Sequence, residues 1–410
     1  MIPAERARPK ASWADARPTP GPCRAMVSEP AAFESFISST MPLEQLGQRF
    51  LPSAGSTQGT VVSAPLAPPG WRLESRDISW NARYRILQTL GNGAQGVVYL
   101  ALRDGADGYE TRVAMKFYFR DPLRTKEDYV AEMRRIALQA QRVSEIQNDN
   151  LVTIRDFLQF NETRVMIMEW IDGLDLRHLL DLRRYRKLQE RLSRPEWERL
   201  NDVVVSAGPH HCRLKPGVAV DIVRGCLAGL SDLHHRGIVH CDLKPSNIMI
   251  KRNGANKIID IDSSTSVLGN DAELVRGTPY YMAPEQIEER RVSYAADIAS
   301  LGYVLVEMLT GKLLFEHCRT IDQLLEAKRS FAERLETFLP TEIRSDPALF
   351  GLCRKMTAVD PADRFPDAEA ADLDRRLGAA AFHRRLVKSD LSTEYDRELA
   401  WWIEACQTRV

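Results

Sequence analysis

The segment His240-Cys241-Asp242-Leu243-Lys244-Pro245-Ser246-Asn247 combines an acid, a cation and an amide in one short loop, and Asp260 follows thirteen residues after its end. Asp242 can accept a proton from a hydroxyl group, Lys244 can neutralise a phosphate, and Asn247 can share a divalent cation with Asp260. Transfer of a phosphoryl group depends on positioned charge more than on covalent chemistry. The loop therefore favours phosphoryl transfer, although the pattern Asp-x-Lys-x-x-Asn alone is also compatible with a polar surface loop.

A glycine-rich hairpin lies upstream, between strand-like runs at residues 84–90 and 97–102. Its pattern Gly-x-Gly-x-x-Gly-x-Val lacks side chains at three points, so backbone N–H groups can approach phosphates there. A strand rather than a helix follows, which separates the pattern from the dinucleotide-binding fingerprint. The residues expected to surround a nucleotide in this hairpin are Leu90, Gly91, Gly93, Gly96 and Val98.

A third strand is expected over residues 112–119, where alternation places Ala114 and Lys116 on one face. Lys116 can reach the α- and β-phosphates of a nucleotide from this face. Glu132 borders the apolar stripe of the helix that follows, and we assign it as the carboxylate that orients Lys116. The alternatives are a solvated surface role for this glutamate, or the same role for Glu127 or Glu145.

Further motifs follow in a fixed order. Residues 166–173 read as a connector between two lobes, and Gly277-Thr278-Pro279-Tyr280-Tyr281-Met282-Ala283-Pro284-Glu285 is a long, specific motif downstream of the loop. Segments at residues 297–302 and 360–364 complete the set. With all these motifs, residues 84–377 resemble the eukaryotic-like serine/threonine protein kinases.

The resemblance implies an α+β class and a bilobal protein-kinase fold. The β-rich small lobe would span residues 84–169 and the helical large lobe residues 172–377, with a charged insertion at about 181–215. Residues 1–80 would form a largely disordered segment rich in Pro and Ala, and residues 378–410 a helical extension.

The resemblance also implies the site. ATP would be the phosphate donor and Mg²⁺ the metal, with Mn²⁺ as a substitute, and a protein Ser or Thr hydroxyl would be the acceptor. The catalytic residues would be Asp242, Lys244, Asn247 and Lys116, with Asn247 and Asp260 as metal ligands. The nucleotide-binding set would add Ala114, Glu132, Met168 as gatekeeper, and the backbone of Glu169 and Ile171.

Three structural roles follow from the same resemblance. Asp297 would anchor the backbone of the catalytic loop, and Arg364 would pair with Glu285 in a buried ion pair. Removing one partner of such a pair typically costs about 3–5 kcal/mol. The segment at residues 277–285 would position a peptide, and Thr278 with Lys244 fits Ser/Thr acceptors; this argues against a small-molecule substrate.

Two positions depart from the family pattern. Cys241 replaces an Arg that reads a phosphorylated activation segment, so we expect activity that depends little on phosphorylation of Ser263, Ser264, Thr265 or Ser266. Cys241 itself is either a buried filler, which we favour, or a redox-sensitive thiol. Asp262 replaces a Gly, and either restricts conversion to an inactive arrangement or weakens catalysis. In the second case the chain would be a pseudokinase that binds a nucleotide or a partner.

The insertion and the C-terminal region leave alternatives open. The basic run at residues 183–187 is expected to be a solvated helix face, with docking of an acidic partner as the alternative. His210-His211-Cys212 lacks a second ligand pair at a metal-binding spacing, so a metal site there is disfavoured. Near the end of the chain an apolar stripe is expected to pack on the large lobe, with a partner-binding helix exposing Trp401 as the alternative. The stripe comprises Leu391, Tyr395, Leu399, Trp402, Ile403 and Cys406.

Composition limits the remaining classes. The 410 residues contain 56 Lys and Arg and 56 Asp and Glu, so no net field favours nucleic acid. Seven scattered cysteines suggest free thiols in a reducing compartment. No secretory signal and no apolar run of about eighteen residues occurs. We therefore expect a cytoplasmic protein whose regulatory signal arrives through a soluble activator or docking partner.

Overall fold

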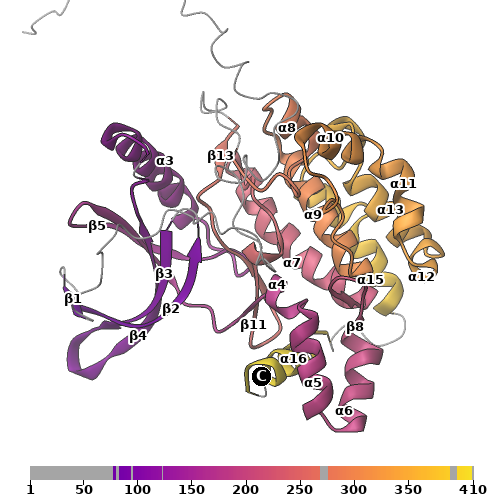
Figure 1. The fold of residues 1–410 in the computed structure, drawn as a ribbon, viewed down its shortest axis with the longest axis horizontal. Helices are drawn as coiled ribbons and strands as arrows, with labels where there is room; N and C mark the ends of the chain where they lie inside the picture. Colours follow the sequence, from indigo (N-terminus) through magenta and orange to yellow (C-terminus); the bar gives the residue numbers. More distant parts are fainter. Residues whose placement is uncertain are drawn as a thin grey trace, which may run out of the picture. The chain divides into compact units, whose positions relative to one another are not determined.

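In the computed structural model, the described part of the chain begins with a six-stranded antiparallel sheet with the order β1-β2-β3-β4-β6-β5 (Figure 1). The structure describes residues 77–79, 83–93, 96–121, 123–267, 276–387 and 395–408. The sheet starts at Asp77, earlier than the expected boundary at residue 84, and expectations about residues 1–76 lie outside the described ranges. The strands are β1 Asp77–Ser79, β2 Arg83–Gly93, β3 Gly96–Asp104, β4 Glu110–Tyr118, β5 Ile154–Phe160 and β6 Thr163–Glu169.

Strand β4 divides its side chains between two faces of this sheet. Val113, Met115 and Phe117 are fully buried in an apolar cluster on one face. Ala114 and Lys116 therefore point to the other face, as alternation predicts. Apolar side chains thus cover one face of the sheet, and the other face carries the Lys116 ammonium.

Helix α3, Lys126–Ser144, is the long helix of the small lobe (Figure 1). It begins with a capping box, because the Thr125 side chain accepts from Asp128 N and the Asp128 carboxylate accepts from Thr125 N. Its buried stripe includes Tyr129, Met133 and Ile136. The opposite border of that stripe carries the charged residues of the site.

The core of the large lobe is formed by α7, Pro216–His235, and α9, Tyr294–Thr310. Every residue of α9 after Tyr294 is buried, which explains its apolar composition. Gly237, with φ of 72°, follows the end of α7. Within the part of the chain that the structure describes, no helix combines the length and apolarity needed to cross a bilayer.

The other elements complete the α+β fold with a β-rich small lobe and a helical large lobe, as expected. The short strands are β7 Gly173–Asp175, β8 Val205–Ala207, β9 Cys212–Leu214, β10 Ile238–Val239, β11 Ile248–Lys251, β12 Asn256–Ile258 and β13 Thr265–Ser266. The helices up to residue 310 are α4 Leu176–Leu179, α5 Leu182–Arg191, α6 Arg194–Arg199 and α8 Pro284–Glu288. Those that follow are α10 Ile321–Arg329, α11 Phe331–Phe338, α12 Thr341–Arg344, α13 Pro347–Met356, α14 Ala368–Leu373, α15 Ala379–Val387 and α16 Tyr395–Thr408. Single turns are η1 Ala106–Gly108, η2 Leu200–Val204, η3 Pro245–Asn247 and η5 Pro361–Asp363.

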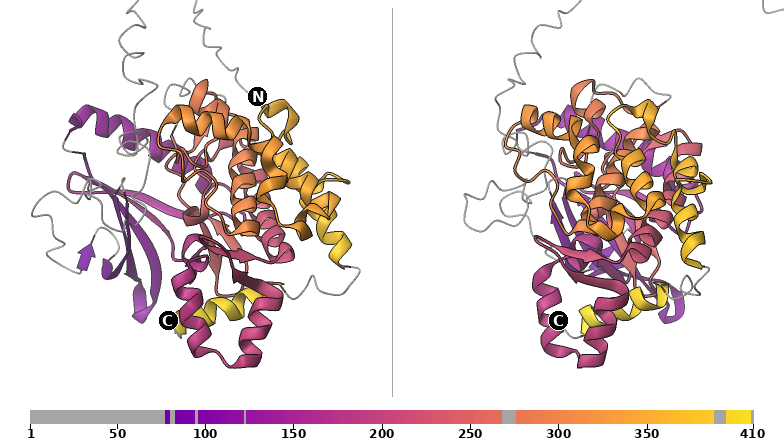
Figure 2. Two further views of the ribbon diagram at one scale, coloured as in Figure 1. Left: turned by 45° about the vertical axis from the view of Figure 1, so that its right-hand side comes forward. Right: turned by 90° about the vertical axis from the view of Figure 1, so that its right-hand side faces the viewer.

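The insertion and the C-terminal helix pack together. Helix α16 lies beside α5 and η2 (Figure 2). Arg199 pairs with Glu398 of α16, with 3.0 Å between Nε and Oε2. The predicted stripe is buried from Tyr395 to Cys406, so packing within the chain is confirmed, and Leu391 lies outside the described residues. Trp401 is half-buried beneath the Arg199 guanidinium.

Candidate active site

Asp297 of α9 anchors the loop at residues 240–247, which we call the catalytic loop. Its two carboxylate oxygens accept from the backbone N–H groups of His240 and Cys241, each at 2.9 Å. This confirms the predicted anchor. The anchor holds Cys241 in a left-handed backbone conformation with φ of 67°, which a non-glycine residue adopts only at a cost.

Asp242 lies in a buried triangle with Lys244 and Thr278. Thr278 Oγ1 donates to Asp242 Oδ1 at 2.7 Å, and Lys244 Nζ donates to Asp242 Oδ2 at 2.7 Å and to Thr278 Oγ1 at 2.8 Å. Asn247 Nδ2 adds a bond of 2.9 Å to the Asp242 carbonyl oxygen. The three catalytic residues that the loop sequence predicts are therefore brought together, and the segment at 277–285 is tied directly to them.

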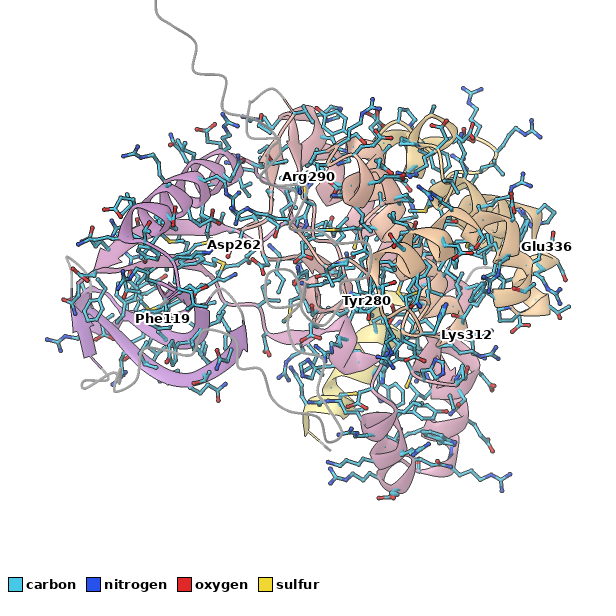
Figure 3. All side chains as sticks on the ribbon, turned by 45° about the horizontal axis from the view of Figure 1, so that its top comes forward. Phe119, Asp262, Tyr280, Arg290, Lys312 and Glu336 are labelled. Atoms are coloured by element: carbon cyan, nitrogen blue, oxygen red, sulfur yellow. The ribbon has the colours of Figure 1, made fainter. Side chains whose placement is uncertain are left out.

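Lys116 lies between two carboxylates. Its Nζ is 2.8 Å from Asp260 Oδ1 and 2.6 Å from Asp262 Oδ2. The other oxygen of Asp262 accepts from the Tyr118 hydroxyl at 2.7 Å. Asp262, labelled in Figure 3, is therefore a charged partner of Lys116 at a position where a glycine would have none.

The protonation of this group follows from burial and charge. Burial disfavours the Lys116 ammonium, but the two aspartates outweigh it and raise its pKa. Burial acts against ionisation of Asp260 as well, yet Lys116 lowers the pKa of that carboxyl. Burial and then the adjacent Asp260 charge raise the pKa of Asp262 above its ordinary value. Asp262 is therefore the more easily protonated carboxyl of the pair.

The assignment of Glu132 as the partner of Lys116 is wrong for this arrangement. The Glu132 carboxylate receives two hydrogen bonds from the Arg276 guanidinium, both at 2.6 Å, and two from Arg135, at 3.1 and 3.4 Å. Arg135 also donates to the backbone carbonyl groups of Asp262 and Ser264. Glu132 is thus bound by two guanidinium groups, and Asp262 supplies the second negative charge beside Lys116. Through Glu132 and Arg135, helix α3 is connected to the chain at residues 262–276.

Four of the residues predicted to bind the nucleotide lie on paired positions of the sheet. Val98 pairs in register with Lys116, and Ala114 pairs with Met168. Leu90 is 44% exposed. The pairing therefore places apolar side chains next to the lysine that would bind phosphates, as the sequence predicts.

The three glycines of the hairpin have different reasons to be glycine. A Cβ added at Gly91 or Gly93 would meet nothing within 4 Å. A Cβ at Gly96, whose φ is 153°, would overlap the backbone carbonyl oxygen of Phe117 on β4. Gly96 therefore allows close approach of two strands, while Gly91 and Gly93 leave room above the site.

The connector at residues 166–173 is held through the side chain of Glu169. Glu169 accepts from Lys257 Nζ at 2.5 Å and from Thr153 N at 2.7 Å. Lys257 lies on β12 and is buried. This lysine was not singled out from the sequence, and only its place in a β-hairpin beside the connector gives it a role.

Asn247 and Asp260 fit a magnesium ion by their chemistry. Ile259 N donates to the Asn247 carbonyl at 2.9 Å, so the residue before Asp260 is joined to Asn247. The Asp260 side chain is 30% exposed, and its Oδ1 is paired with Lys116. An amide and a carboxylate supply the hard oxygen ligands that Mg²⁺ prefers. No group of three or more His, Cys, Asp or Glu able to hold a metal occurs in the described ranges.

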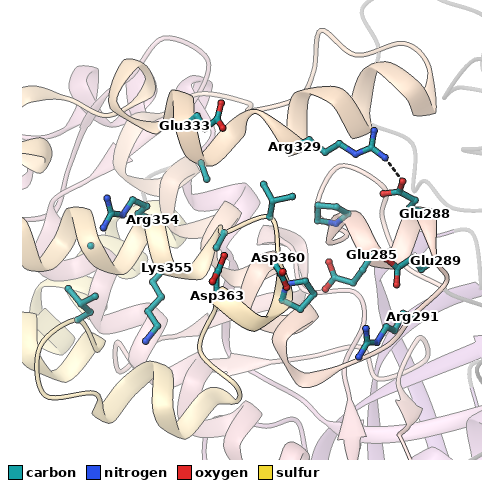
Figure 4. Close-up of a pocket in the computed structure, with 17 residues that line it drawn as sticks. Glu285, Glu288, Glu289, Arg291, Arg329, Glu333, Arg354, Lys355, Asp360 and Asp363 are labelled. Atoms are coloured by element: carbon teal, nitrogen blue, oxygen red, sulfur yellow. Dashed lines mark hydrogen bonds and ion pairs between the residues drawn. The ribbon is translucent and has the colours of Figure 1, made fainter.

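The segment at residues 277–285 is anchored at its far end by the predicted ion pair. Arg364 donates to both Glu285 oxygens, at 2.7 and 2.8 Å, and both side chains are almost fully buried. A neighbouring cavity of about 880 Å³ lies between α8, α13 and the η5 turn (Figure 4). None of the nucleotide-binding or catalytic residues predicted above lines it.

Cys241 is the buried filler that the sequence favours. The residue is 3% exposed, and its thiol donates to the Val239 carbonyl at 3.6 Å. Burial, and then the nearby Asp297 charge, raise its pKa well above the ordinary value. The thiolate needed for redox chemistry is thus disfavoured. The six cysteines of the described ranges are free.

Comparison with known proteins agrees with this geometry. The family model described as "Protein kinase domain" matches residues 84–373. The chain is 26% identical to the serine/threonine-protein kinase PrkC of Bacillus subtilis over 78% of this chain and 44% of that protein. It is 30% identical to the serine/threonine-protein kinase pkn3 of Myxococcus xanthus over 70% of this chain and 48% of that protein.

Both relatives extend well beyond the part that matches, since less than half of each is covered. A plant protein, mitogen-activated protein kinase kinase kinase 3 of Arabidopsis thaliana, is 26% identical over 60% of this chain and 34% of its own length. The catalytic loop, the lysine of β4 and the Glu285–Arg364 pair thus occur in a chain that belongs to the protein kinase family, of the eukaryotic-like serine/threonine type.

Proposed function

We propose that this chain transfers the γ-phosphate of ATP to Ser or Thr hydroxyls of protein substrates, with Mg²⁺ as the metal. The observation that carries the proposal is the Asp242–Lys244–Thr278 triangle, in which the Asp242 carboxylate accepts a hydrogen bond from the Thr278 hydroxyl at 2.7 Å. The printed names of the relatives support it, since they describe serine/threonine-protein kinases.

In the proposed reaction the oxygen of the substrate hydroxyl attacks the γ-phosphorus, and Asp242 accepts the proton of that hydroxyl. The bond between the γ-phosphorus and the β–γ bridging oxygen breaks, and ADP leaves. Lys244 would offset charge on the transferred group, and Lys116 would hold the α- and β-phosphates. Asn247 and Asp260 would hold Mg²⁺, which supplies charge neutralisation at the phosphates. The adenine ring would be enclosed by apolar side chains, those of Leu90, Val98, Ala114 and Met168.

The arrangement of Lys116 defines what must change for this reaction. Its ammonium is shared by Asp260 and Asp262, so binding of phosphates has to compete with two carboxylates. A pseudokinase that binds a nucleotide without transfer is the alternative raised by Asp262. The relatives' names do not favour it.

The test is transfer of label from γ-labelled ATP, with magnesium, to the protein itself and to a generic basic protein. Asp242→Asn is expected to reduce transfer by at least about a hundredfold, because a general base contributes that much. Asp149→Asn, which changes an exposed aspartate in a turn, is the matched control and should transfer like the natural chain. Equal transfer by Asp242→Asn and the natural chain would refute the role of Asp242. No transfer despite measurable ATP binding would favour the pseudokinase.

A further inference from the structure

Lys328 of α10 is a lysine in the interior of the large lobe. Its residue exposure is 0%, and no carboxylate of the described ranges forms an ion pair with it. Its Nζ lies 4.1 Å from the ring centroids of both Tyr303 and Phe315. An ammonium buried without a carboxylate is costly, so such a residue calls for an explanation.

The hydrogen bond that Lys328 makes supplies this explanation. Its Nζ donates to the backbone carbonyl of Tyr280 at 2.8 Å. Tyr280 lies two residues after Thr278, whose hydroxyl is bonded to Asp242 and Lys244. The Tyr280 hydroxyl in turn donates to the Cys318 carbonyl at 3.4 Å. Residue 280 is therefore held through both its main chain and its side chain.

We infer that Lys328 is a positioning residue for the peptide-binding segment at residues 277–285, fixing the backbone that presents an acceptor peptide to Asp242. The inference rests on the proposed function. The segment is attached at several points: Thr278 to the loop at residues 240–247, Tyr280 to Lys328, Tyr281 to Ser300 and Glu307 of α9, and Glu285 to Arg364. Lys328 holds the Tyr280 carbonyl, which lies between the contact with Asp242 and the Glu285–Arg364 ion pair.

The aromatic rings explain why a lysine can serve here. Tyr303 and Phe315 meet edge to face, with centroids 5.3 Å apart and ring planes at 89°. Their faces attract a cation and replace part of its lost hydration. Burial also lowers the pKa of Lys328 well below its ordinary value, and a neutral amine would still donate a hydrogen bond to the carbonyl.

Lys312 offers a matched control on the same lobe. Its Nζ also donates to a backbone carbonyl, that of Phe338 at 3.4 Å, and lies 5.6 Å from the Phe338 ring. Unlike Lys328, its partner is outside residues 277–285. Tyr280 and Lys312 are both labelled in Figure 3.

The experiment compares Lys328→Met, Lys328→Arg and Lys312→Met with the natural chain. Steady-state phosphorylation of a Ser/Thr peptide gives KM for the peptide, and calorimetry gives Kd for ATP. Lys328→Met is expected to raise the peptide KM about tenfold, the effect of one lost hydrogen bond to a buried carbonyl, and to leave ATP Kd within about twofold. Lys312→Met should change neither, and Lys328→Arg, which keeps a donor, should retain the peptide KM within about threefold.

A peptide KM that is unchanged in Lys328→Met would overturn the inference, as would an equal loss of ATP affinity. Hydrogen exchange provides a readout that requires no catalysis. Amides of residues 276–287 should exchange faster in Lys328→Met than in Lys312→Met, while those of α7 stay protected. If exchange in this segment is unchanged, the positioning role is refuted; if it quickens but the natural chain transfers no phosphate, only the proposed function fails.

Discussion

At the scale of single residues, Asp262 adds a carboxylate to the site at a position where the family pattern has a glycine. A glycine has no side chain to offer, whereas Asp262 binds both Lys116 and Tyr118. The Asp262 carboxylate therefore pairs with the Lys116 ammonium, which the phosphates of a nucleotide would need as their partner. We therefore expect this substitution, outside the loop at residues 240–247, to influence nucleotide binding.

Replacing Asp262 by Asn is expected to strengthen ATP binding. Asn keeps an acceptor for the Tyr118 hydroxyl but removes one of the two charges that compete with phosphates for Lys116. We expect Kd for ATP with magnesium to fall about tenfold, which corresponds to about 1.4 kcal/mol. Titration calorimetry on the natural chain and the variant measures this difference. An affinity that is unchanged or weaker would show that Lys116 does not need release from Asp262.

Cys241 shows the limits of inference at a single position. Its identity predicts loss of the arginine that reads a phosphorylated segment, and its burial identifies it as a filler. The structure adds that Thr265 and Ser266 pair with β10, and that Ser263, Ser264 and Ser266 are buried. In this arrangement the three buried serine hydroxyls are poorly accessible to a modifying enzyme. That activity depends little on their phosphorylation stays a prediction.

At the scale of elements, α9 and the segment at 277–285 share a buried acid. Glu307 of α9 accepts from the Tyr281 hydroxyl at 2.6 Å, and His211 Nε2 lies 3.8 Å from its other oxygen. Burial raises the pKa of Glu307 from 4.5 to about 7, opposed by the Tyr281 hydrogen bond and the Arg177 charge. Burial also lowers the pKa of His211.

The sign of the resulting pH dependence is fixed by the direction of the Glu307 shift. The folded state binds its proton more tightly than the unfolded state, so this contribution to stability is complete below about pH 4.5 and is lost as pH rises through about 7. The loss amounts to about 3 kcal/mol. His211 acts in the opposite sense, because burial lowers its pKa and the folded form resists protonation.

Glu307→Gln is expected to abolish this loss. Gln resembles the protonated acid, so the variant should match the natural chain at about pH 4 and exceed it by about 2–3 kcal/mol at about pH 8. Urea denaturation at the two pH values measures the difference. Glu316→Gln, at a half-exposed glutamate beside His210, is the control and should leave the pH dependence unaltered. Parallel curves for Glu307→Gln and the natural chain would contradict the raised pKa.

At the scale of the whole molecule, two segments far apart in the sequence stabilise each other. The insertion supplies α5, α6 and η2, and α16 packs against this group and against α7 (Figure 2). The Arg199–Glu398 pair joins the two segments across 199 positions of sequence. The basic run keeps Arg183, Arg186 and Lys187 exposed, while Tyr185 is buried.

Adjacent tryptophans of α16 test this packing. Trp402 is 1% exposed, whereas Trp401 is half-buried. Trp402→Ala should lower the free energy of unfolding by about 3–5 kcal/mol, because it leaves a cavity in the core. Trp401→Ala should cost less than about 1 kcal/mol, since it removes mainly a partly exposed contact with Arg199. Chemical denaturation of both variants checks the contrast, and similar losses would indicate that the two faces of α16 are not distinguished as described.

The sequence alone determined what depends on short spacing. The order of the motifs predicted the two lobes, and the loop at residues 240–247 predicted a base, a cation and an amide close together. Period-2 alternation placed Ala114 and Lys116 on one face, and the helical period predicted the buried stripe of α16. These features succeed because neighbours in the chain obey fixed backbone geometry.

The resemblance implied the long-range pair of Glu285 with Arg364, but only the tertiary structure decided the partners of other buried polar groups. Glu132 meets Arg276 and not the expected Lys116, Glu169 meets Lys257, and Lys328 reaches the Tyr280 carbonyl. Several cations could satisfy each carboxylate, and spacing carries no information about which of them lies nearest after folding. Burial makes each choice energetically important, because an unpaired charge in the interior is costly and its partner is set by the packing of the whole chain.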